Sequence, residues 1–220
     1  HYLLGDTFNA TMNYRFTWIA RGFLAYDRLT PTTLDDRIQT WMRDTPLPAQ
    51  FAQMNQLDSH DTDRVMFACK GDLRRVKALY AFALAFPGAP MIYYGGETGI
   101  DGEFAEDGRR CMPWDSLDME LVNWTKGAIA TRRDLTPLRV GTYQTVVMDD
   151  AQKVYGFART HNQQTVYALF SQNDAPVTVT IPDIVGNWRD ALNGGESISA
   201  GADGLTVTLA DRGAAWFVKG

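Results

Sequence analysis

The sequence predicts an α/β part over residues 1–140 followed by an all-β antiparallel sandwich over residues 141–220. In the first part, a largely apolar stretch at residues 73–86 leads through Pro87-Gly88 into a second apolar run at residues 89–94. A buried helix followed by a buried strand is typical of α/β units, whose parallel strands are covered on both faces. From residue 141 onward, apolar residues recur at every second position between turn residues, a pattern that indicates an antiparallel sandwich.

The elements of the first part follow from apolar spacing, from capping residues and from proline or glycine stops. We expect a short strand at 7–14, a helix at 16–25, a helix at 33–43 capped by Thr33, a helix at 73–86 capped by Asp72, a fully buried strand at 89–94 and a helix at 119–134. Residues 99–113 form a long, charged, glycine-bearing loop, and loops of this length over a compact domain are usually functional.

The second part is expected to consist of short strands separated by Asp, Asn, His and Gly residues. We expect strands at 143–148, 153–159, 165–171, 177–181, 205–209 and 214–218. The boundary between the two parts is placed near Val140.

Composition limits the possible partners of the protein. The net charge of -5 argues against a nucleic-acid or anionic-membrane surface, which would need clustered Lys and Arg side chains. No apolar run approaches the length that spans a bilayer. Cys69 and Cys111 lack the spacing of a metal site or a disulfide scaffold, so two free thiols are favoured over a bridge between them.

One polar stretch, residues 57–64, carries most of the candidate chemistry. It follows an apolar lead-in and brings one imidazole, three carboxylates and a guanidinium together within a few residues. One interpretation is a catalytic or binding loop at the end of a buried strand. The other is that Ser59, Asp61, Thr62 or Asp63 only caps a helix beginning near Val65, which would leave His60 and Arg64 unexplained.

Four local patterns resemble a known family. Residues 57–64 (LDSHDTDR), 86–97 (FPGAPMIYYGGE), 109–115 (RRCMPWD) and 8–14 (FNATMNY) are similar to segments of the α-amylase superfamily of glycoside hydrolases. The similarity is closest to the neopullulanase, cyclomaltodextrinase and maltogenic amylase branch. The resemblance implies that the first part is the C-terminal portion, about strands six to eight, of a (β/α)8 TIM barrel.

The resemblance also implies a chemistry, which is retaining cleavage of α-glucosidic bonds in maltodextrins, cyclodextrins or pullulan, with hydrolysis or transfer. By position, Asp61 matches the carboxylate that stabilises the transition state, and His60 matches a neighbouring sugar-binding imidazole. Hydrogen bonds from such a carboxylate to sugar hydroxyls tighten as the ring flattens, so they favour the transition state over the substrate. Arg109 is a candidate sugar clamp, with a surface ion pair as its alternative.

Three further residues are candidate substrate ligands. Glu97 is assigned to a distal subsite, with a solvated loop carboxylate as the alternative, and Asp107 is a candidate outer sugar contact. Tyr14 is a candidate apolar face for a glucose ring, with a place in the core as its alternative. The sequence departs from the branch at Gly96, where an Asp is usual, and this departure concerns the outer contacts more than the cleavage site.

The resemblance places the nucleophile Asp and the acid Glu on strands upstream of residue 1. We therefore expect this chain alone to be inactive and to need the N-terminal part of the barrel as its partner, with a homodimer left open. No cofactor is expected; calcium at Asp101-Gly102-Glu103 is considered, but two carboxylates are too few for a full shell. Two rival hypotheses are a non-catalytic amylase-like interaction subunit and a glucan-binding fragment formed by the sandwich.

Overall fold

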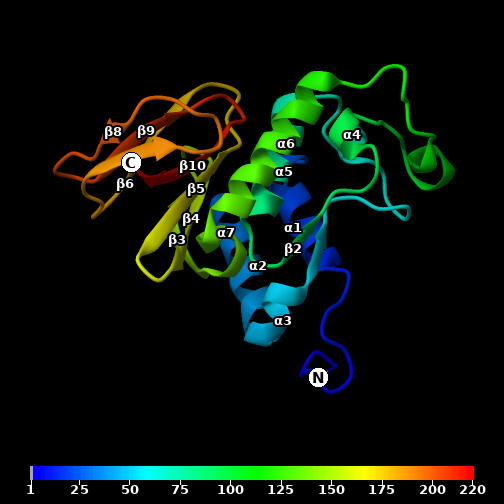
Figure 1. Cartoon of the computed structure of the whole chain (residues 1–220), viewed down its shortest axis with the longest axis horizontal. Coiled ribbons are helices and arrows are strands. Elements are labelled where there is room, and N and C mark those ends of the chain that lie inside the picture. Colours follow the sequence, from blue (N-terminus) through cyan, green and yellow to red (C-terminus); the bar gives the residue numbers. More distant parts are fainter. Residues whose placement is uncertain (1) are drawn as a thin grey trace.

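A computed structural model describes residues 2–220 and contains a helical part followed by a β-sandwich (Figure 1). The first part consists of α1 (Tyr14–Leu24), α2 (Pro31–Asp44), α3 (Leu47–Ala52), β1 (Met54–Gln56), α4 (Val65–Ala68), α5 (Leu73–Ala85), β2 (Ala89–Met91), the 3-10 turns η1 (Gly96–Thr98) and η2 (Ala105–Arg109), α6 (Met119–Asp134) and α7 (Thr136–Val140). The second part consists of β3 (Thr142–Asp149), β4 (Val154–His161), β5 (Gln164–Ser171), β6 (Val177–Ile181), β7 (Asn187–Asp190), β8 (Ile198–Ser199), β9 (Leu205–Leu209) and β10 (Ala214–Lys219).

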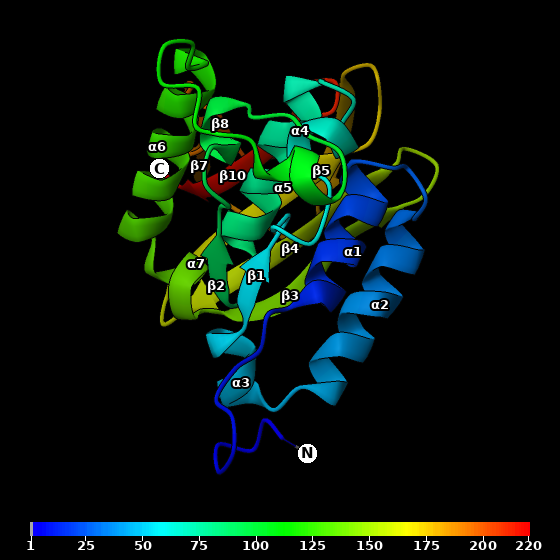
Figure 2. The same ribbon diagram turned by 90° about the vertical axis from the view of Figure 1, so that its right-hand side faces the viewer.

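The elements are arranged in layers, which Figure 2 shows from the side of the parallel strands. β1 and β2 form one layer, and α1 and α5 pack behind them. Behind these helices lies a six-stranded sheet in the order β3-β4-β5-β10-β7-β8, and β6 pairs with β9 in a further two-stranded sheet. The helices are therefore enclosed between the parallel pair and the sandwich, as in a barrel segment joined to a β-domain.

The parallel strands are shorter than predicted. β1 and β2 pair in parallel over only three positions, from Met54 with Ala89 to Gln56 with Met91. The strand predicted over residues 7–14 is reduced to a single bridge between Met12 and Met54. β2 is partly exposed, so the prediction of a fully buried strand over residues 89–94 is wrong. Both differences have one physical reason, since each outer edge lacks a neighbouring strand within the described residues, and strands without partners on both sides are neither long nor fully covered.

The long helices agree with the sequence predictions, although one cap differs. α5 begins after Asp72, whose carboxylate accepts a hydrogen bond from the Arg74 backbone N–H at 3.0 Å, as predicted. α2 begins earlier than predicted, because Thr30 rather than Thr33 provides the capping oxygen. Pro31 then occupies the first helical position, where its missing N–H costs nothing.

The sandwich has two kinds of strand. β6 and β9 alternate buried and exposed residues, as predicted, because one of their faces meets solvent. β4 is buried at six successive positions, because helices cover one of its faces and the β6–β9 pair covers the other. β7 and β8 were not predicted, since they are only four and two residues long.

One aromatic core joins the two parts. Phe82 of α5 lies with its ring centroid 4.9 Å from that of Phe170 and 5.8 Å from that of Phe157, both in the six-stranded sheet. The Gln172 amide, just after β5, donates hydrogen bonds to the carbonyl oxygens of Phe23 (2.6 Å) and Leu29 (3.0 Å). The change from helices to strands lies between Val140 and Thr142, but the core continues across it.

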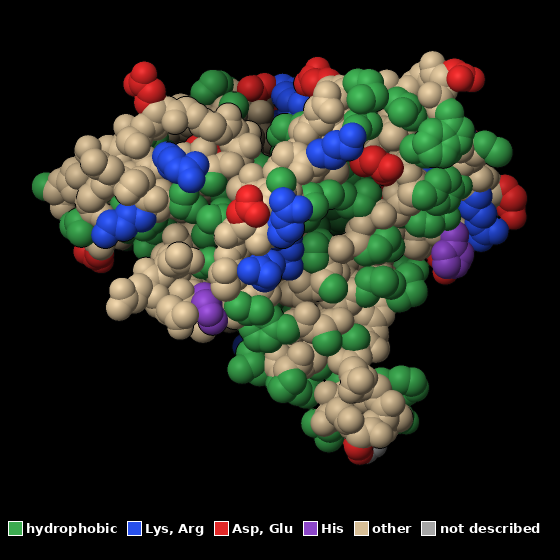
Figure 3. All heavy atoms as spheres, viewed as in Figure 1, with side chains coloured by type: hydrophobic (Ala, Val, Ile, Leu, Met, Phe, Trp, Pro, Cys, Tyr) green, Lys and Arg blue, Asp and Glu red, His purple; other side chains and the backbone are tan. Residues whose placement is uncertain are grey.

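The surface carries charges of both signs among apolar and polar side chains (Figure 3). Over residues 2–220, none of the helices combines the length and the apolar character that crossing a membrane requires.

Candidate functional site

In the loop after β1, the residue that bonds the start of α4 is not one of the candidate site residues. α4 begins at Val65, as the capping interpretation expects, but the N-cap position is Arg64, whose side chain caps nothing, and the first helical N–H, that of Val65, donates instead to Asp58 Oδ2 at 2.9 Å. Thr62 Oγ1 accepts the Ser59 N–H at 3.0 Å within the loop. Asp61 is therefore not the capping residue.

Asp61, His60 and Arg109 converge at the carboxyl end of β1. The Asp61 Oδ2 lies 3.4 Å from His60 Nε2, and its Oδ1 lies 3.9 Å from Arg109 Nη2. Arg109 Nε also donates to the His60 carbonyl oxygen at 3.1 Å, which fixes the guanidinium against this loop. The side chains of Asp61 and His60 are 60% and 54% exposed, so their polar atoms remain available to a ligand.

Tyr14 reaches the same loop through Ser59. The Tyr14 hydroxyl lies 3.0 Å from Ser59 Oγ, and Ser59 Oγ accepts the Asp61 backbone N–H at 3.1 Å. Ser59 thus connects the start of α1 to the backbone of the candidate carboxylate. Its place in the site was not predicted, because a serine next to charged residues reads as a turn or cap residue.

Asp107 occupies a local ion pair in the loop after β2. Its carboxylate contacts Arg110 Nη2 at 2.6 Å and accepts the Glu103 N–H at 2.7 Å. These contacts lower the pKa of Asp107, with the backbone hydrogen bond from Glu103 as the main cause and Arg110 as the second. The Asp107 carboxylate thus stabilises the loop in which it lies. The role of Asp107 as a sugar ligand stays a prediction.

Glu97 and Gly96 lie on η1, directly after the glycine turn that follows β2. Glu97 is half-buried, and its assignment to a distal subsite is not tested by any contact. Gly96 is buried, and a Cβ added there would lie 2.5 Å from the Tyr80 hydroxyl. A side chain at position 96 would therefore point toward α5, so the departure from the branch at this position concerns core packing.

Aromatic side chains accompany the polar residues. Trp114 and Phe104 in the loop after β2 are 74% and 67% exposed, and Tyr94 is 42% exposed. Figure 3 shows apolar side chains gathered at the end of the molecule opposite the sandwich, where this loop lies in Figure 1. Exposed aromatic faces of this kind can pack against the apolar faces of pyranose rings.

The sequence also drew attention to Asp101, Cys69 and Cys111, as residues considered for metal or thiol chemistry. Within residues 2–220, no three His, Cys, Asp or Glu side chains come together as a metal site. Asp101 Oδ1 accepts the Gly102 N–H at 2.9 Å, a contact within the turn. Both cysteines are free, as expected; Cys69 is buried and Cys111 is exposed. Burial raises the pKa of Cys69 to about 12, so its thiol is inert at neutral pH.

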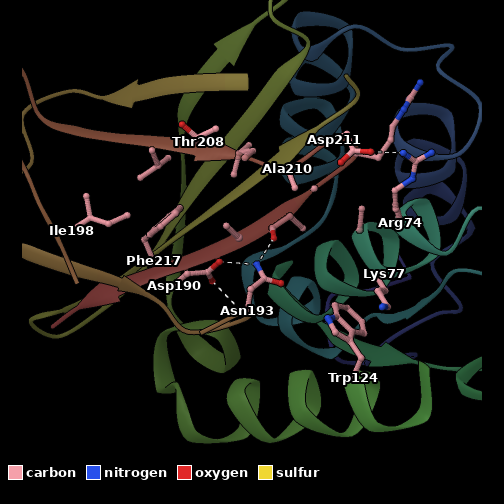
Figure 4. A pocket seen from close by; sticks show the side chains of 17 residues that line it. Arg74, Lys77, Trp124, Asp190, Asn193, Ile198, Thr208, Ala210, Asp211 and Phe217 are labelled. Atoms are coloured by element: carbon pink, nitrogen blue, oxygen red, sulfur yellow. Dashed lines mark hydrogen bonds and ion pairs between the residues drawn. The ribbon is translucent and has the colours of Figure 1, made fainter. Parts of the chain in front are cut away.

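A cavity of about 440 Å³ lies away from this loop, between α5, α6 and the sandwich (Figure 4). Trp124 and Phe217 form part of its wall. Its polar side chains bind one another, since Asn193 Nδ2 donates to Asp190 Oδ2 at 2.6 Å and Arg74 pairs with Asp211. None of the predicted site residues lines this cavity.

Two arginines behind the loop were not assigned a role from the sequence. Arg21 is fully buried and pairs with Asp63 Oδ1 at 2.5 Å. Arg64 is also fully buried and lies against the rings of Tyr93 and Tyr94. For Arg64 the one available signal was its position in the polar stretch that follows β1, whereas Arg21 lies within α1 and its sequence position gave no signal.

Family comparisons match nearly the whole chain. The profile described as "Alpha amylase, catalytic domain" matches residues 1–167, and the profile described as "Maltogenic Amylase, C-terminal domain" matches residues 143–216. A cyclomaltodextrinase of Geobacillus thermopakistaniensis is 35% identical over 94% of this chain and 36% of its own length. Neopullulanase 2 of Thermoactinomyces vulgaris is 30% identical over the same shares of the two chains. The chain thus spans about a third of the length of these curated relatives.

Solved structures agree with the sequence comparisons. A cyclomaltodextrinase structure superposes with a TM-score of 0.87 at 28% identity, covering 99% of this chain and 38% of that one. The ligand-free cyclic α-maltosyl-(1→6)-maltose hydrolase of Arthrobacter globiformis superposes with a TM-score of 0.85 at 27% identity, covering 100% of this chain and 47% of that one. The fold is that of a barrel segment followed by the β-sandwich of these enzymes, and the chain belongs to the α-amylase family, in its cyclomaltodextrinase, neopullulanase and maltogenic amylase branch.

Proposed function

We propose that this chain supplies the transition-state-stabilising carboxylate, Asp61, of a retaining glycoside hydrolase that cleaves α-glucans. The observation that carries the proposal is that Asp61 stands free of the helix cap, beside His60 and Arg109, at the carboxyl end of β1. An exposed carboxylate can accept hydrogen bonds from two neighbouring sugar hydroxyls. Such bonds shorten as positive charge develops on the ring, so they lower the barrier more than they strengthen substrate binding.

His60 and Arg109 have supporting roles in this proposal. The imidazole and the guanidinium donate hydrogen bonds to sugar oxygens, and Arg109 also holds the His60 backbone in place. Glu97, Asp107 and Tyr14 are assigned to outer sugar contacts. The proposed substrates are cyclodextrins, maltodextrins and pullulan, and the names of two relatives, cyclomaltodextrinase and neopullulanase 2, support the first and the last of these.

The nucleophile and the acid come, in this proposal, from the barrel strands that the relatives carry before the matched segment. The exposed outer edges of the Met12–β1–β2 sheet are where those strands would pair. The 220-residue chain alone is therefore expected to hydrolyse no glucan. A homodimer of the full-length protein stays a separate prediction, which analytical ultracentrifugation tests.

The decisive experiment compares Asp61→Asn with wild type in the full-length protein that the gene encodes. Asn keeps the size of the side chain but loses the charge, so we expect kcat on maltodextrin, cyclodextrin or pullulan to fall about 10²–10³-fold with little change in KM. Asp115→Asn is the matched control, because Asp115 is an exposed carboxylate of the loop after β2. An unchanged kcat for Asp61→Asn contradicts the assignment of Asp61. A full-length protein that acts on none of these glucans contradicts the enzyme proposal and favours a non-catalytic relative.

A further inference from the structure

Arg64 lies in an enclosed position behind the candidate site. Its side chain is fully buried, and its guanidinium carbon lies 4.4 Å from the ring centroid of Tyr93 and 4.8 Å from that of Tyr94. Its Nη2 donates to the Tyr94 carbonyl oxygen at 2.5 Å. A planar cation is thus held against two aromatic rings and one backbone oxygen of the segment that follows β2.

The backbone around Arg64 joins the loop after β1 to the loop after β2. The Arg64 N–H donates to the Gly102 carbonyl oxygen at 2.9 Å, and Arg109 Nε donates to the His60 carbonyl oxygen at 3.1 Å. Between these two bonds the loops touch at Gly108, where an added Cβ would lie 3.1 Å from the Thr62 carbonyl oxygen. The loop that carries His60 and Asp61 is therefore held to the loop that carries Arg109 by backbone and side-chain hydrogen bonds.

The guanidinium is poorly suited to a purely stabilising role. Among residues 2–220, its buried Nε and Nη1 have no hydrogen-bond partner, and the Asp58 carboxylate lies 4.0 Å from Nη1. Asp58 is itself buried and caps α4, and its pKa is raised mainly by burial. Buried charges that are incompletely paired cost stability, and a well-packed apolar side chain would serve a core better.

We propose that Arg64 is a positioning residue for Asp61, holding the loops after β1 and β2 in one fixed relation through its stack on Tyr93 and Tyr94. The role rests on the proposed function of Asp61. If the stack is lost, the two loops move independently, and Asp61 and Arg109 no longer approach a bound sugar together. Displacements of about 1 Å in such a site can cost roughly 10²-fold in rate, even when the changed residue does not touch the substrate.

The test uses three variants of the full-length protein: Arg64→Lys, Arg64→Met and the control Arg28→Met. Arg28 also lies over a tyrosine, at 4.7 Å from the Tyr26 centroid, but it is exposed. Lys keeps a cation opposite the buried Asp58 carboxylate, so this charge is not left alone in the core, but Lys lacks the planar face and the fork of donors that the site uses. If Arg64→Met does not fold, Arg64→Lys decides the question.

Two readouts are expected to change together. For Arg64→Lys we expect kcat on an α-glucan to fall about 10–100-fold with KM changed less than about threefold, since the lost interaction orients Asp61 rather than binding sugar. We also expect backbone amides at residues 100–108 to exchange hydrogen at least about tenfold faster, because opening of this loop becomes easier. Arg28→Met should leave both readouts unchanged.

Kinetics and loop exchange for Arg64→Lys that match those of Arg28→Met would overturn the positioning role. A loss of activity that only follows the loss of folded protein, with loop exchange unchanged, would overturn it as well. Failure of the proposed function has a different signature, namely a wild-type protein that is inactive on every glucan. The exchange measurement needs no activity, so it then still decides whether Arg64 fixes the two loops.

Discussion

Asp58 and Asp61 lie three residues apart in one loop but have opposite environments. Asp58 is 2% exposed, and one of its carboxylate oxygens accepts the first N–H of α4, so this carboxylate has a structural role. Asp61 is largely exposed beside an imidazole and a guanidinium, so its carboxylate serves a ligand. The different roles of the two carboxylates depend on Asp58. Without it, the free N–H at the start of α4 would need another side-chain oxygen of the loop as its acceptor.

The same capping chemistry can be measured at Asp72, the N-cap of α5. Its Oδ1 accepts the Arg74 N–H at 3.0 Å, and its Oδ2 lies 2.7 Å from Arg74 Nη2. We expect Asp72→Ala to lower the free energy of unfolding by about 1 kcal/mol, because the helix loses its capping oxygen. Asp72→Asn keeps an oxygen for the cap and loses the ion pair with Arg74 and the longer one, at 3.8 Å, with Arg75, so it should cost about 0.5 kcal/mol, less than Asp72→Ala. Urea unfolding at pH 7 measures both values.

The effect of Asp72 also has a predictable pH dependence. Hydrogen bonding from the Arg74 side chain is the main cause that lowers the pKa of this carboxyl below its ordinary 3.8. A lowered pKa means that the charged form is stabilised by folding, so its contribution is present above pH 3.8 and is lost as pH falls through the folded-state pKa. The difference between wild type and Asp72→Asn should therefore shrink on acidification below pH 3.8. A difference that grows on acidification would contradict the assignment.

At this scale the sequence predicted types of residue better than their partners. The resemblance directed attention to His60, Asp61 and Arg109, and the structure places them together. It gave no sign that Asp107 would be taken up by Arg110, because that pairing depends on how the loop folds on itself. The capping role of Asp58 was equally hidden, since four other oxygen-bearing side chains stand closer to Val65 in the sequence.

At the scale of elements, η1 and α5 are fitted to each other through Gly96 and Tyr80. The buried Tyr80 hydroxyl has no hydrogen-bond partner in the part of the chain that the structure describes, and an added Cβ at Gly96 would lie 2.5 Å from it. We expect Gly96→Ala to lower the free energy of unfolding by about 1–3 kcal/mol through overpacking. Tyr80→Phe removes an unpaired hydroxyl and should lie within about 0.5 kcal/mol of wild type.

A double-mutant cycle tests this fit. In the Tyr80→Phe background the cost of Gly96→Ala should fall by about 1 kcal/mol or more, because the opposing oxygen is gone. Gly127→Ala in α6 is the control, since nothing lies within 4 Å of an added Cβ there, and it should stabilise by about 0.5–1 kcal/mol. Additive effects of the two substitutions would show that Gly96 and Tyr80 do not compete for one space.

Prediction of elements succeeded where the pattern was long. α5 and α6 appear at their predicted positions, because each has a capping Asp and a run of apolar residues at helical spacing. The strands over residues 7–14 and 89–94 were overestimated, since strand length depends on neighbouring strands that a local pattern cannot report. β8 has only two residues and depends on pairing with β7.

At the scale of the whole molecule, the helical part and the sandwich share one core and one set of buried hydrogen bonds. Arg159 of β4 is fully buried and donates to the carbonyl oxygens of Ala85, Leu138 (3.2 Å), Gly141 (2.9 Å) and Thr142 (3.1 Å). Ala85 is the last residue of α5, and Leu138 and Gly141 lie at the end of α7. The carbonyl oxygens at helix C-termini carry partial negative charge, so they stabilise this buried cation.

This arrangement predicts that the two parts unfold together. Burial lowers the pKa of Arg159 to about 9, so the side chain is still charged at neutral pH. We expect Arg159→Met to lower the free energy of unfolding by about 3 kcal/mol, because several buried carbonyl oxygens lose a charged donor. Arg133→Met should change it by less than about 0.5 kcal/mol, since the Arg133 side chain is 75% exposed.

The measurement is urea unfolding of two single-tryptophan variants, each detected by tryptophan fluorescence. One variant keeps only Trp41, in the helical part, and the other keeps only Trp188, in the sandwich. Both residues are nearly fully buried, Trp41 in the core that joins the two parts and Trp188 in the core between the sandwich sheets. If Arg159 joins the two parts, the two probes report coincident transitions, and Arg159→Met shifts both by the same amount. A variant in which only the Trp188 transition moves would mean that the sandwich is stable on its own. A shared transition would instead make the sandwich a structural support for the barrel loops, because α5, whose last carbonyl oxygen accepts a hydrogen bond from Arg159, leads directly into β2 and the loop that carries Arg109.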